Sequence, residues 1–364
     1  MQKFSKVIHV IADLGNGGAE RQLIELLKHN PSHKLLVFRN TGIYKDELDA
    51  NKVNYIELNV ANSLSIIFNL LKIRKAIKLS NTSIVHAWMY NACFIISFIK
   101  FTMRIPHFIV WGIRCSNMDL KHYPFSLKLI IKLCRTISFK TNSIIYNSNA
   151  GLIYHRKIGF SKTFNKVIYN GIDYQKFFFS KYHRSKQRKI LGIRKNAIVI
   201  ICAARVDPMK NHFNLLKAFQ KIRRKNKKVI LLLLGKGTEQ LDSQDGVIQL
   251  GMKLKIENYY SVGDMIIIPS KFGEGFSNAL AEGMACQLFP LTTDVGDSLK
   301  IISNIGLVIK NSTIQEITRA LDKALNIKKN ELISLQKNSR KRILKEFNIK
   351  KMSSEYNKCY KELN

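Results

Sequence analysis

The chain has 364 residues, of which 46% are hydrophobic and 23% charged, and its formal net charge is +35. This length and composition allow a large buried core, favour about two domains and exclude a disordered chain. A membrane-spanning helix needs an uncharged apolar run of roughly 18 residues, and charged or helix-breaking residues interrupt the most apolar stretch, 91–113. The first twenty residues show no signal-peptide pattern, so a cytoplasmic protein is expected.

The predicted elements of the first half alternate between short apolar strands and amphipathic helices. Strands are expected at 7–12, 34–38, 83–88, 107–111, 143–148 and 166–170. Helices are expected between them, at 20–28, 64–79 and 125–139. Strands that are apolar throughout and alternate with helices indicate a parallel sheet that is covered on both faces.

The second half repeats this pattern. Its predicted strands lie at 197–204, 228–235, 246–251, 264–270, 287–293 and 306–309. The fold class is therefore α/β, with two Rossmann-like, doubly wound parallel-sheet domains. We expect an N-terminal domain at 1–175, a basic linker at 176–195, a C-terminal domain at 196–346 and a final helix at 347–364 that packs back toward the N-terminal domain.

Cysteine spacing and charge restrict the partners. The six cysteines include no C-x-x-C pair, which favours buried free thiols over a zinc site or a disulfide framework. Residues 121–195 hold 17 Lys and Arg against one acid, Asp173, and the stretch 63–80 reads as a basic amphipathic helix. These features predict contact with an anionic membrane surface, with a merely solvated basic face as the alternative. Without an RNA-binding signature or a Cys/His finger, no nucleic-acid partner is expected.

Three loops that follow predicted strands carry the chemistry. In "LGNGGAE", Gly17 and Gly18 open a helix and let backbone amides approach an anion, although the dinucleotide pattern G-x-G-x-x-G is not met. In "AARVDPMKN", Arg205 and Lys210 stand at a helix entrance, where a diphosphate would be favoured; an ordinary basic surface is the alternative.

The third loop, "PSKFGEGFSNALAEGMAC", places two glutamates on either side of a helix start. If all the steps between Glu274 and Glu282 were helical, the two would span roughly 12 Å. That length matches a nucleoside diphosphate sugar, with one carboxylate accepting hydrogen bonds from hydroxyls at each end and helix amides facing the phosphates. The alternative is a favourable acid at the helix start followed by an exposed helix residue.

With "NGID" at 170–173 and "TTDVGD" at 292–297, these loops resemble the family 4 glycosyltransferases of the GT-B fold over nearly the whole chain. The resemblance implies two domains that face a central cleft, the first binding the acceptor and the second the nucleotide sugar. It implies a hexosyltransferase-type enzyme that moves a sugar from a nucleotide diphosphate sugar to an acceptor hydroxyl with retention. It also implies that no cofactor or metal is used, and no D-x-D occurs in the sequence.

The resemblance also assigns roles to individual residues. Arg205 and Lys210 would hold the diphosphate and stabilise the departing charge. Glu274 would orient the donor sugar, and Glu282 would bind the ribose. The predicted catalytic set comprises Glu274, Arg205, Lys210 and Arg114, and the predicted donor-binding set comprises Glu282, Gly17, Gly18, Phe276, Ser277 and Asn278.

The chain departs from the family pattern in three places. Arg114 stands where many relatives carry a histidine that contacts the donor sugar, and an arginine there would stabilise charge or bind the acceptor. Glu-Ala becomes Glu282-Gly283, and Gly-x-Pro becomes "QLF" at 287–289. His86 could line the cleft or be a structural histidine at a strand end.

The expected function is synthesis of a surface polysaccharide, O-antigen or capsule, on a glycan or lipid-linked acceptor at the inner face of the plasma membrane. The alternatives are a sugar-nucleotide epimerase of the same fold, or a non-catalytic basic protein that binds a membrane or nucleic acid.

Overall fold

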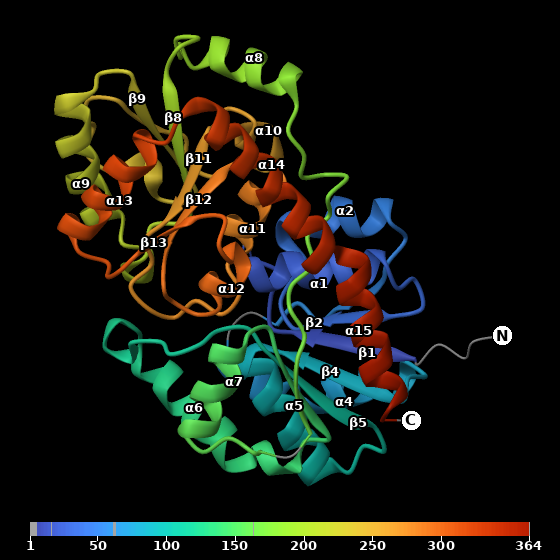
Figure 1. Ribbon diagram of the computed structural model, residues 1–364. Coiled ribbons are helices and arrows are strands. Elements are labelled where there is room, and N and C mark those ends of the chain that lie inside the picture. The colour runs from blue at the N-terminus through green and yellow to red at the C-terminus, as the bar shows by residue number, and fades with distance from the viewer. Residues whose placement is uncertain (1–5, 16, 61–62, 163, 364) are drawn as a thin grey trace. The chain divides into compact units, whose positions relative to one another are not determined.

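The structure is a computed structural model that describes residues 6–15, 17–60, 63–162 and 164–363. The chain divides into two compact units, one formed by 1–171 together with 349–364, and the other by 172–348. Each unit is built around its own parallel sheet (Figure 1). The predicted fold class, two doubly wound α/β units, is confirmed.

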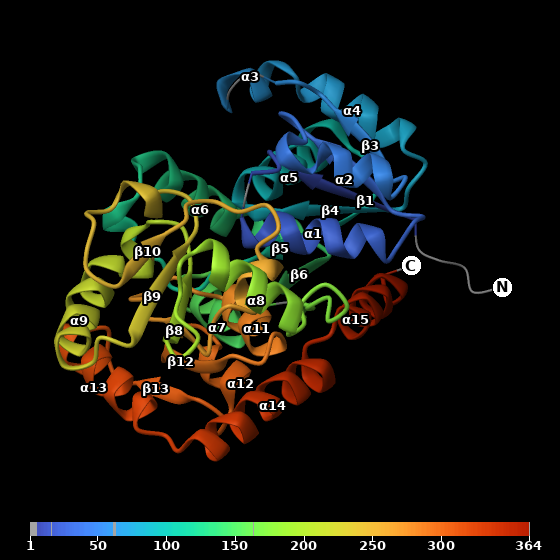
Figure 2. The same cartoon turned by 90° about the horizontal axis from the view of Figure 1, so that it is seen from above.

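The first unit contains a seven-stranded sheet in the order β3-β2-β1-β4-β5-β6-β7. Buried residues alternate between its two faces, so that Ile8 and Val10 of β1 join one core cluster while Val7 and Ile11 join the other. Helices α4, α5 and α6 cover the first face, and α1 and α15 cover the second, where they lie side by side in Figures 1 and 2. The strands are β1 (Val7–Ile11), β2 (Lys34–Val37), β3 (Asn54–Glu57), β4 (Ile84–Trp88), β5 (Phe108–Ile113), β6 (Ser143–Tyr146) and β7 (Asn165–Val167), and the helices are α1 (Gly18–Lys28), α2 (Lys45–Ala50), α3 (Ser63–Phe68), α4 (Leu70–Leu79), α5 (Met89–Met103), α6 (Phe125–Ile137), α7 (Asn149–Lys157) and α15 (Ile349–Lys361).

The second unit contains a six-stranded parallel sheet in the order β10-β9-β8-β11-β12-β13. Helices α9 and α13 lie side by side on one face of this sheet (Figure 2), and α11 packs on the strands β11 and β12. The strands are β8 (Ile198–Ala203), β9 (Val229–Leu234), β10 (Val247–Gln249), β11 (Met265–Ile268), β12 (Phe289–Thr293) and β13 (Leu307–Ile309), and the helices are α8 (Lys181–Ile190), α9 (His212–Lys225), α10 (Glu257–Tyr260), α11 (Asn278–Ala285), α12 (Ser298–Ile302), α13 (Ile314–Leu325) and α14 (Lys329–Glu346).

Twelve predicted strands are found where the apolar runs placed them, but four other features differ from expectation. The edge strand β3 was not predicted, and the most apolar stretch contains the helix α5. The helix expected at 64–79 is two helices, α3 and α4, which meet at Asn69. The stretch 176–195, expected as a linker, contains α8 and belongs to the second unit.

The basic residues of α8 explain why this segment is ordered. Arg184 donates to the backbone carbonyls of Ser261, Val262 and Gly263 and to a carboxylate oxygen of Asp264, at 2.7–3.1 Å. Arg188 donates to the other oxygen of Asp264 at 3.1 Å. Two arginines on one carboxylate therefore fix α8 against the second unit, because charged hydrogen bonds with fixed geometry are the stronger kind.

All six cysteines are buried free thiols, as expected, and burial raises the pKa of several of them, that of Cys115 to about 11 and that of Cys202 to about 12. Among the helices of the described ranges, none is long and apolar enough to cross a membrane.

Candidate active site

The order of strands in the second sheet locates its binding edge. The connections run in opposite directions from β8 and β11, which are neighbours, so the topological switch point lies between these two strands. Ligands of open parallel sheets bind at the carboxyl ends of the strands at such a point. The loop after β8 holds Arg205 and Lys210, and the loop after β11 holds Glu274.

Lys210 and Glu274 meet at this switch point. The Lys210 ammonium forms an ion pair and hydrogen bond with Oε1 of Glu274, and both side chains are largely buried, 15% and 7% exposed. Ser270, at the end of β11, donates its hydroxyl to the same carboxylate oxygen at 2.7 Å. Thr293, the last residue of β12, donates to the Ser270 carbonyl at 2.7 Å, so residues from the loops after β8 and β11, supported by β12, fix one carboxylate.

Arg205 lies on the same loop but has a different partner. Its guanidinium donates to Oδ2 of Asp207 from Nε at 3.2 Å and from Nη2 at 2.9 Å, and its side chain is 51% exposed. The other oxygen of Asp207 accepts from the backbone N–H of Met209 at 2.9 Å, which opens the short 3₁₀ turn at Pro208–Lys210. Arg205 is therefore the open cation of this loop and Lys210 the buried one.

Two neighbouring segments hold the loop after β8 in place. Asn211 has a left-handed backbone, with φ 61° and ψ 34°, and its amide donates to the carbonyls of Pro269 and Ser312 at 3.1 and 2.8 Å. Gly235, just after β9, packs so closely on the backbone of Ala204 and Arg205 that a side chain there would overlap it. Sequence reasoning missed both residues; the glycine in "LGKG" after a strand was the available signal.

The glutamate motif begins in a loop. Helix α11 begins at Asn278 with Ser277 as its N-cap residue, so Glu274 precedes the helix and the two glutamates are not separated by continuous helix. The predicted positions, Glu274 just before the helix and Glu282 within it, are confirmed, while the span of roughly 12 Å assumed eight helical steps and does not apply. The turn of "TTDVGD" supports this loop, because the N–H of Asp297 donates to the Gly275 carbonyl at 3.0 Å and Gly296 fits closely against the same backbone.

Glu282 lies in the interior of the second unit. It is 2% exposed, and Oε2 accepts a hydrogen bond from the hydroxyl of Tyr260, a fully buried residue, at 2.9 Å. The alternative of an exposed helix residue is therefore excluded. The adjacent Gly283 faces Ile266 of β11, whose Cδ1 would lie 2.5 Å from an added Cβ, so the glycine is explained by close helix–sheet packing.

The other members of the predicted donor-binding set differ in their surroundings. Phe276 is buried, and its ring packs edge-on against Phe347 with centroids 5.2 Å apart. Ser277 is buried at the N-cap, and Asn278 is the first residue of α11. Phe276 therefore contributes to the core around α11, whereas Ser277 and Asn278 lie at a helix start close to Glu274.

Gly17 and Gly18 belong to the first unit, where the switch point lies between β1 and β4. Gly17 is the N-cap of α1 with an extended backbone, φ −118° and ψ 169°, and a side chain there would overlap the carboxylate of Glu20. An acid of the chain itself thus already approaches this helix start, where the helix dipole favours negative charge.

Arg114 is held deep in the first unit. Its guanidinium stacks on Trp88, 4.1 Å from the ring centroid, and donates to the Tyr356 hydroxyl at 2.6 Å and to Oδ1 of Asn170 at 3.3 Å. It therefore links β5 to α15 and to the "NGID" segment. These contacts favour an anchoring role over the predicted catalytic one.

A buried histidine cluster lies beside this arginine. His9 bonds to His33 at 3.0 Å and accepts from Trp88 at 3.0 Å, while His86 bonds to the Tyr360 hydroxyl at 2.7 Å. Burial lowers the pKa of all three, that of His33 to about 4. The structural interpretation of His86 is therefore the one that the contacts favour.

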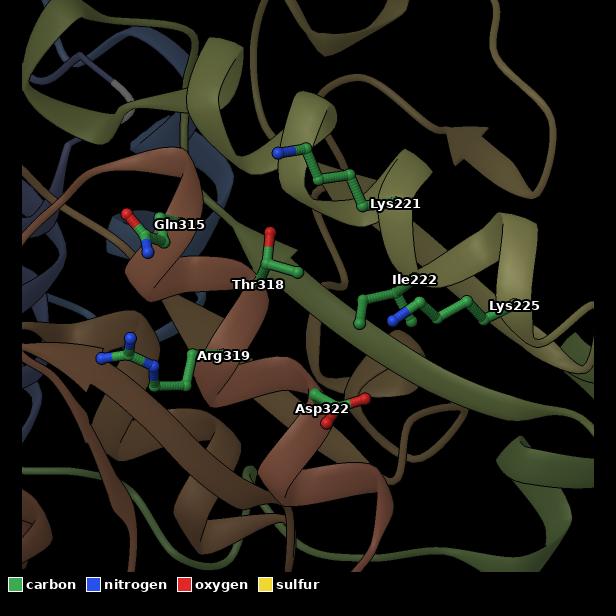
Figure 3. Close-up of a pocket in the computed structure, with 7 residues that line it drawn as sticks. All are labelled: Lys221, Ile222, Lys225, Gln315, Thr318, Arg319 and Asp322. Atoms are coloured by element: carbon green, nitrogen blue, oxygen red, sulfur yellow. The ribbon is translucent and has the colours of Figure 1, made fainter.

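A hollow elsewhere in the second unit does not coincide with these residues. Figure 3 shows it between α9 and α13, with Lys221 and Lys225 on one helix and Thr318 and Arg319 on the other; its volume is about 260 Å³. It lies on the helix layer, away from the carboxyl ends of β8 and β11. We place the candidate site at the strand ends because the paired charges lie there.

Comparison with known proteins identifies the kind of enzyme. Residues 183–342 match the family described as glycosyl transferases group 1. The UDP-Gal:alpha-D-GlcNAc-diphosphoundecaprenol alpha-1,3-galactosyltransferase of Escherichia coli is 23% identical, over 95% of this chain and 94% of that protein. The lipopolysaccharide 1,2-N-acetylglucosaminetransferase of Salmonella typhimurium is 26% identical, over 40% of this chain and 45% of that protein.

A solved structure shows the same fold. The crystal structure of Anabaena HepE in complex with UDP and glucose superimposes with a TM-score of 0.83 at 18% identity, covering 97% of this chain and 98% of HepE. The group 1 match includes Arg205, Lys210, Glu274 and Glu282, and the structural likeness spans both units. The chain therefore has the GT-B fold and is a glycosyltransferase, which confirms the expected hexosyltransferase-type enzyme, and its residues 183–342 match the glycosyl transferases group 1.

Proposed function

We propose that this glycosyltransferase is a retaining family 4 enzyme that transfers a sugar from a nucleotide diphosphate sugar to a hydroxyl of a lipid-linked glycan in surface polysaccharide synthesis, O-antigen or capsule. The observation that carries the proposal is the buried pair of Lys210 and Glu274 at the switch point of the second sheet. A cation there suits a diphosphate, and a carboxylate fixed beside it suits the hydroxyls of a sugar.

The two cations would divide the work on the diphosphate. Lys210 is held by Glu274 yet keeps further N–H donors for phosphate oxygens, since an ammonium has three. Arg205 is half exposed, and its guanidinium can turn from Asp207 toward an incoming phosphate at little cost, because exposed ion pairs are weak. Negative charge that develops on the leaving diphosphate would be stabilised by both.

The carboxylates would act on the two ends of the donor. The hydrogen bond from Ser270 fixes the orientation of the Glu274 carboxylate before the donor binds, so the carboxylate can accept hydrogen bonds from the sugar hydroxyls without reorganising. Glu282 would accept hydrogen bonds from the ribose, and Tyr260 would hold its other oxygen in place. Ser270 and Tyr260 are therefore positioning residues, because each acts through a carboxylate.

The donor and acceptor classes are suggested by the names of similar proteins. The Escherichia coli relative is named for UDP-galactose and for an acceptor linked to diphosphoundecaprenol, and HepE was solved with UDP. We propose a UDP-sugar donor and a polyprenyl-linked acceptor on this basis. The expected absence of a metal belongs to the same proposal, with the two cations in place of a divalent ion, so that transfer should persist in a chelator.

The proposal is tested with a panel of UDP-, GDP- and dTDP-sugars and a diphosphate-linked glycan acceptor. Transfer from one donor, with the anomeric configuration retained in the product, is the expected result. Glu274→Gln and Lys210→Met should abolish transfer, while Lys221→Met, in the hollow between α9 and α13, should leave it unchanged. Epimerised free sugar nucleotide without transfer would refute the proposal in favour of an epimerase.

A further inference from the structure

A surface of the first unit combines exposed aromatic rings with cations. Helix α5 is apolar almost throughout, and its outward residues Phe98 and Phe101 are 40% and 69% exposed. Helix α6 packs beside it and exposes Phe125 and Leu129, and the following 3₁₀ turn exposes Phe139. Exposed hydrophobic residues that stand singly need no explanation, but a contiguous apolar patch marks an interaction site.

These side chains form one face. Residues four and three apart share a side of a helix, and so Phe94, Phe98 and Phe101 form one stripe along α5, with the rings of Phe94 and Phe98 6.1 Å apart. The ammonium of Lys140 joins the two elements, because it lies 5.5 Å from the Phe101 ring centroid and 5.1 Å from that of Phe139. We call this surface, formed by the outer sides of α5, α6 and the turn 138–140, the phenyl–lysine face.

The phenyl–lysine face also carries cations on α6. Lys128, Lys132 and Arg135 are exposed on α6, at the helical spacing that places them beside Phe125 and Leu129. The elements that form the face, residues 89–103 and 125–140, contain five Lys and Arg and no Asp or Glu. Bare phenyl rings among cations, with almost no acid nearby, are the chemistry of an anionic bilayer surface: rings enter the acyl boundary and ammonium groups meet phosphates.

Other occupants fit less well. A second copy of the chain would bring the same face against itself in a two-fold dimer, and its cations would then oppose cations. A merely solvated basic surface would explain the lysines but not phenyl rings that are 64% to 75% exposed at Phe139, Phe101 and Phe125. The apolar and charged parts are explained together only by a lipid surface.

We propose that the phenyl–lysine face docks the enzyme on anionic phospholipid. The inference rests on the proposed function for its purpose, because a lipid-linked acceptor must be reached at a bilayer. Each cation near an anionic surface should raise the partition coefficient about fivefold. Each phenyl ring that enters the boundary should raise it at least about tenfold.

The test is co-sedimentation of the full chain, without donor, with vesicles of phosphatidylcholine alone or with about one third phosphatidylglycerol. Binding to the anionic vesicles only, weakened by salt, is expected. Phe101→Gln with Lys140→Gln should lower the partition coefficient about fiftyfold. The matched control is Tyr182→Gln with Lys186→Gln in α8, where an exposed ring and an ammonium also lie 5.5 Å apart; its binding should be unchanged.

Three outcomes would overturn the proposal. They are recovery in the supernatant with anionic vesicles, an equal loss in the two double variants, or concentration-dependent dimers in sedimentation velocity that the Phe101 and Lys140 changes abolish. Lys128→Gln with Lys132→Gln repeats the test without altering a ring. Donor turnover is measured separately in detergent-free buffer. Intact turnover without vesicle binding refutes only the docking face, and vesicle binding without turnover of any donor refutes only the proposed function.

Discussion

The ion pair at the switch point has opposite consequences for stability and activity. Lys210→Met removes the cation from a carboxylate that is 7% exposed and leaves only the Ser270 hydroxyl bonded to Oε1. Breaking a buried pair by removing one partner costs about 3–5 kcal/mol, and with that hydrogen bond kept we expect the lower end. For a unit of this size, the melting temperature should fall by about 6–12 °C.

Adding Glu274→Gln to this variant removes the unpaired charge and keeps the bond with Ser270. Most of the lost unfolding free energy should therefore return, although transfer activity should remain absent in both single variants and in the double variant. Differential scanning calorimetry and a donor turnover assay measure the two quantities. Arg205→Met is the control on the same loop, with a loss of unfolding free energy below about 1 kcal/mol, because the arginine side chain is half exposed and Asp207 keeps its hydrogen bond from the Met209 N–H.

The reasoning fails if the fall in melting temperature of the double variant equals the sum of the falls in the two single variants. In that case the carboxylate would not depend on the ammonium, and the pair would not be the source of the lost stability.

Three further predictions concern other contacts. Tyr260→Phe should lower the free energy of unfolding in urea by about 1.5–3 kcal/mol and weaken UDP binding, because the buried Glu282 carboxylate loses a donor; unchanged UDP affinity would contradict its positioning role. Gly283→Ala should lower the free energy of unfolding by about 1–3 kcal/mol, because the added Cβ overpacks against Ile266. Adding Ile266→Val removes Cδ1 and should restore the lost stability if this contact is the cause. Because His33 is neutral in the fold and its unfolded pKa is 6.5, stability should fall by about 3 kcal/mol from pH 6.5 to about 4, seen by tryptophan fluorescence; a slope that His33→Gln leaves unchanged would refute this.

The strands could be predicted because parallel strands covered on both faces are apolar throughout, and a run such as "VILLLL" is visible without any partner. Helix α5 escaped prediction for the same reason, since its outer side carries phenyl rings and no helical period separates two faces. Segment 181–190 looked like a linker because it is basic, but Arg184 and Arg188 bond to Asp264 and to carbonyls far away in the sequence.

The sequence predicted the loops that form the candidate site, but not the contacts between residues of different loops. A strand followed by a basic or Gly-rich turn places Lys210 and Glu274 at the same edge of a sheet, but their contact depends on β8 and β11 being neighbours. Ser270 lies inside the quoted third loop but was given no role, and Tyr260 lies in no motif, because the roles of both arise from the carboxylates that they meet in the fold. Arg114 was assigned from its position in a pattern, and only the structure shows that Tyr356 of α15 accepts a hydrogen bond from it.

The burial of every native thiol makes the chain a convenient starting point for chemical labelling. Thiols react as thiolates, and the natural cysteines combine poor access with a raised pKa, about 12 for Cys202. A cysteine introduced at an exposed position of each unit would therefore be the preferred target of a maleimide dye. Energy transfer between two such dyes, recorded before and after a sugar nucleotide is added, would follow the separation of the two units during catalysis without any background substitution.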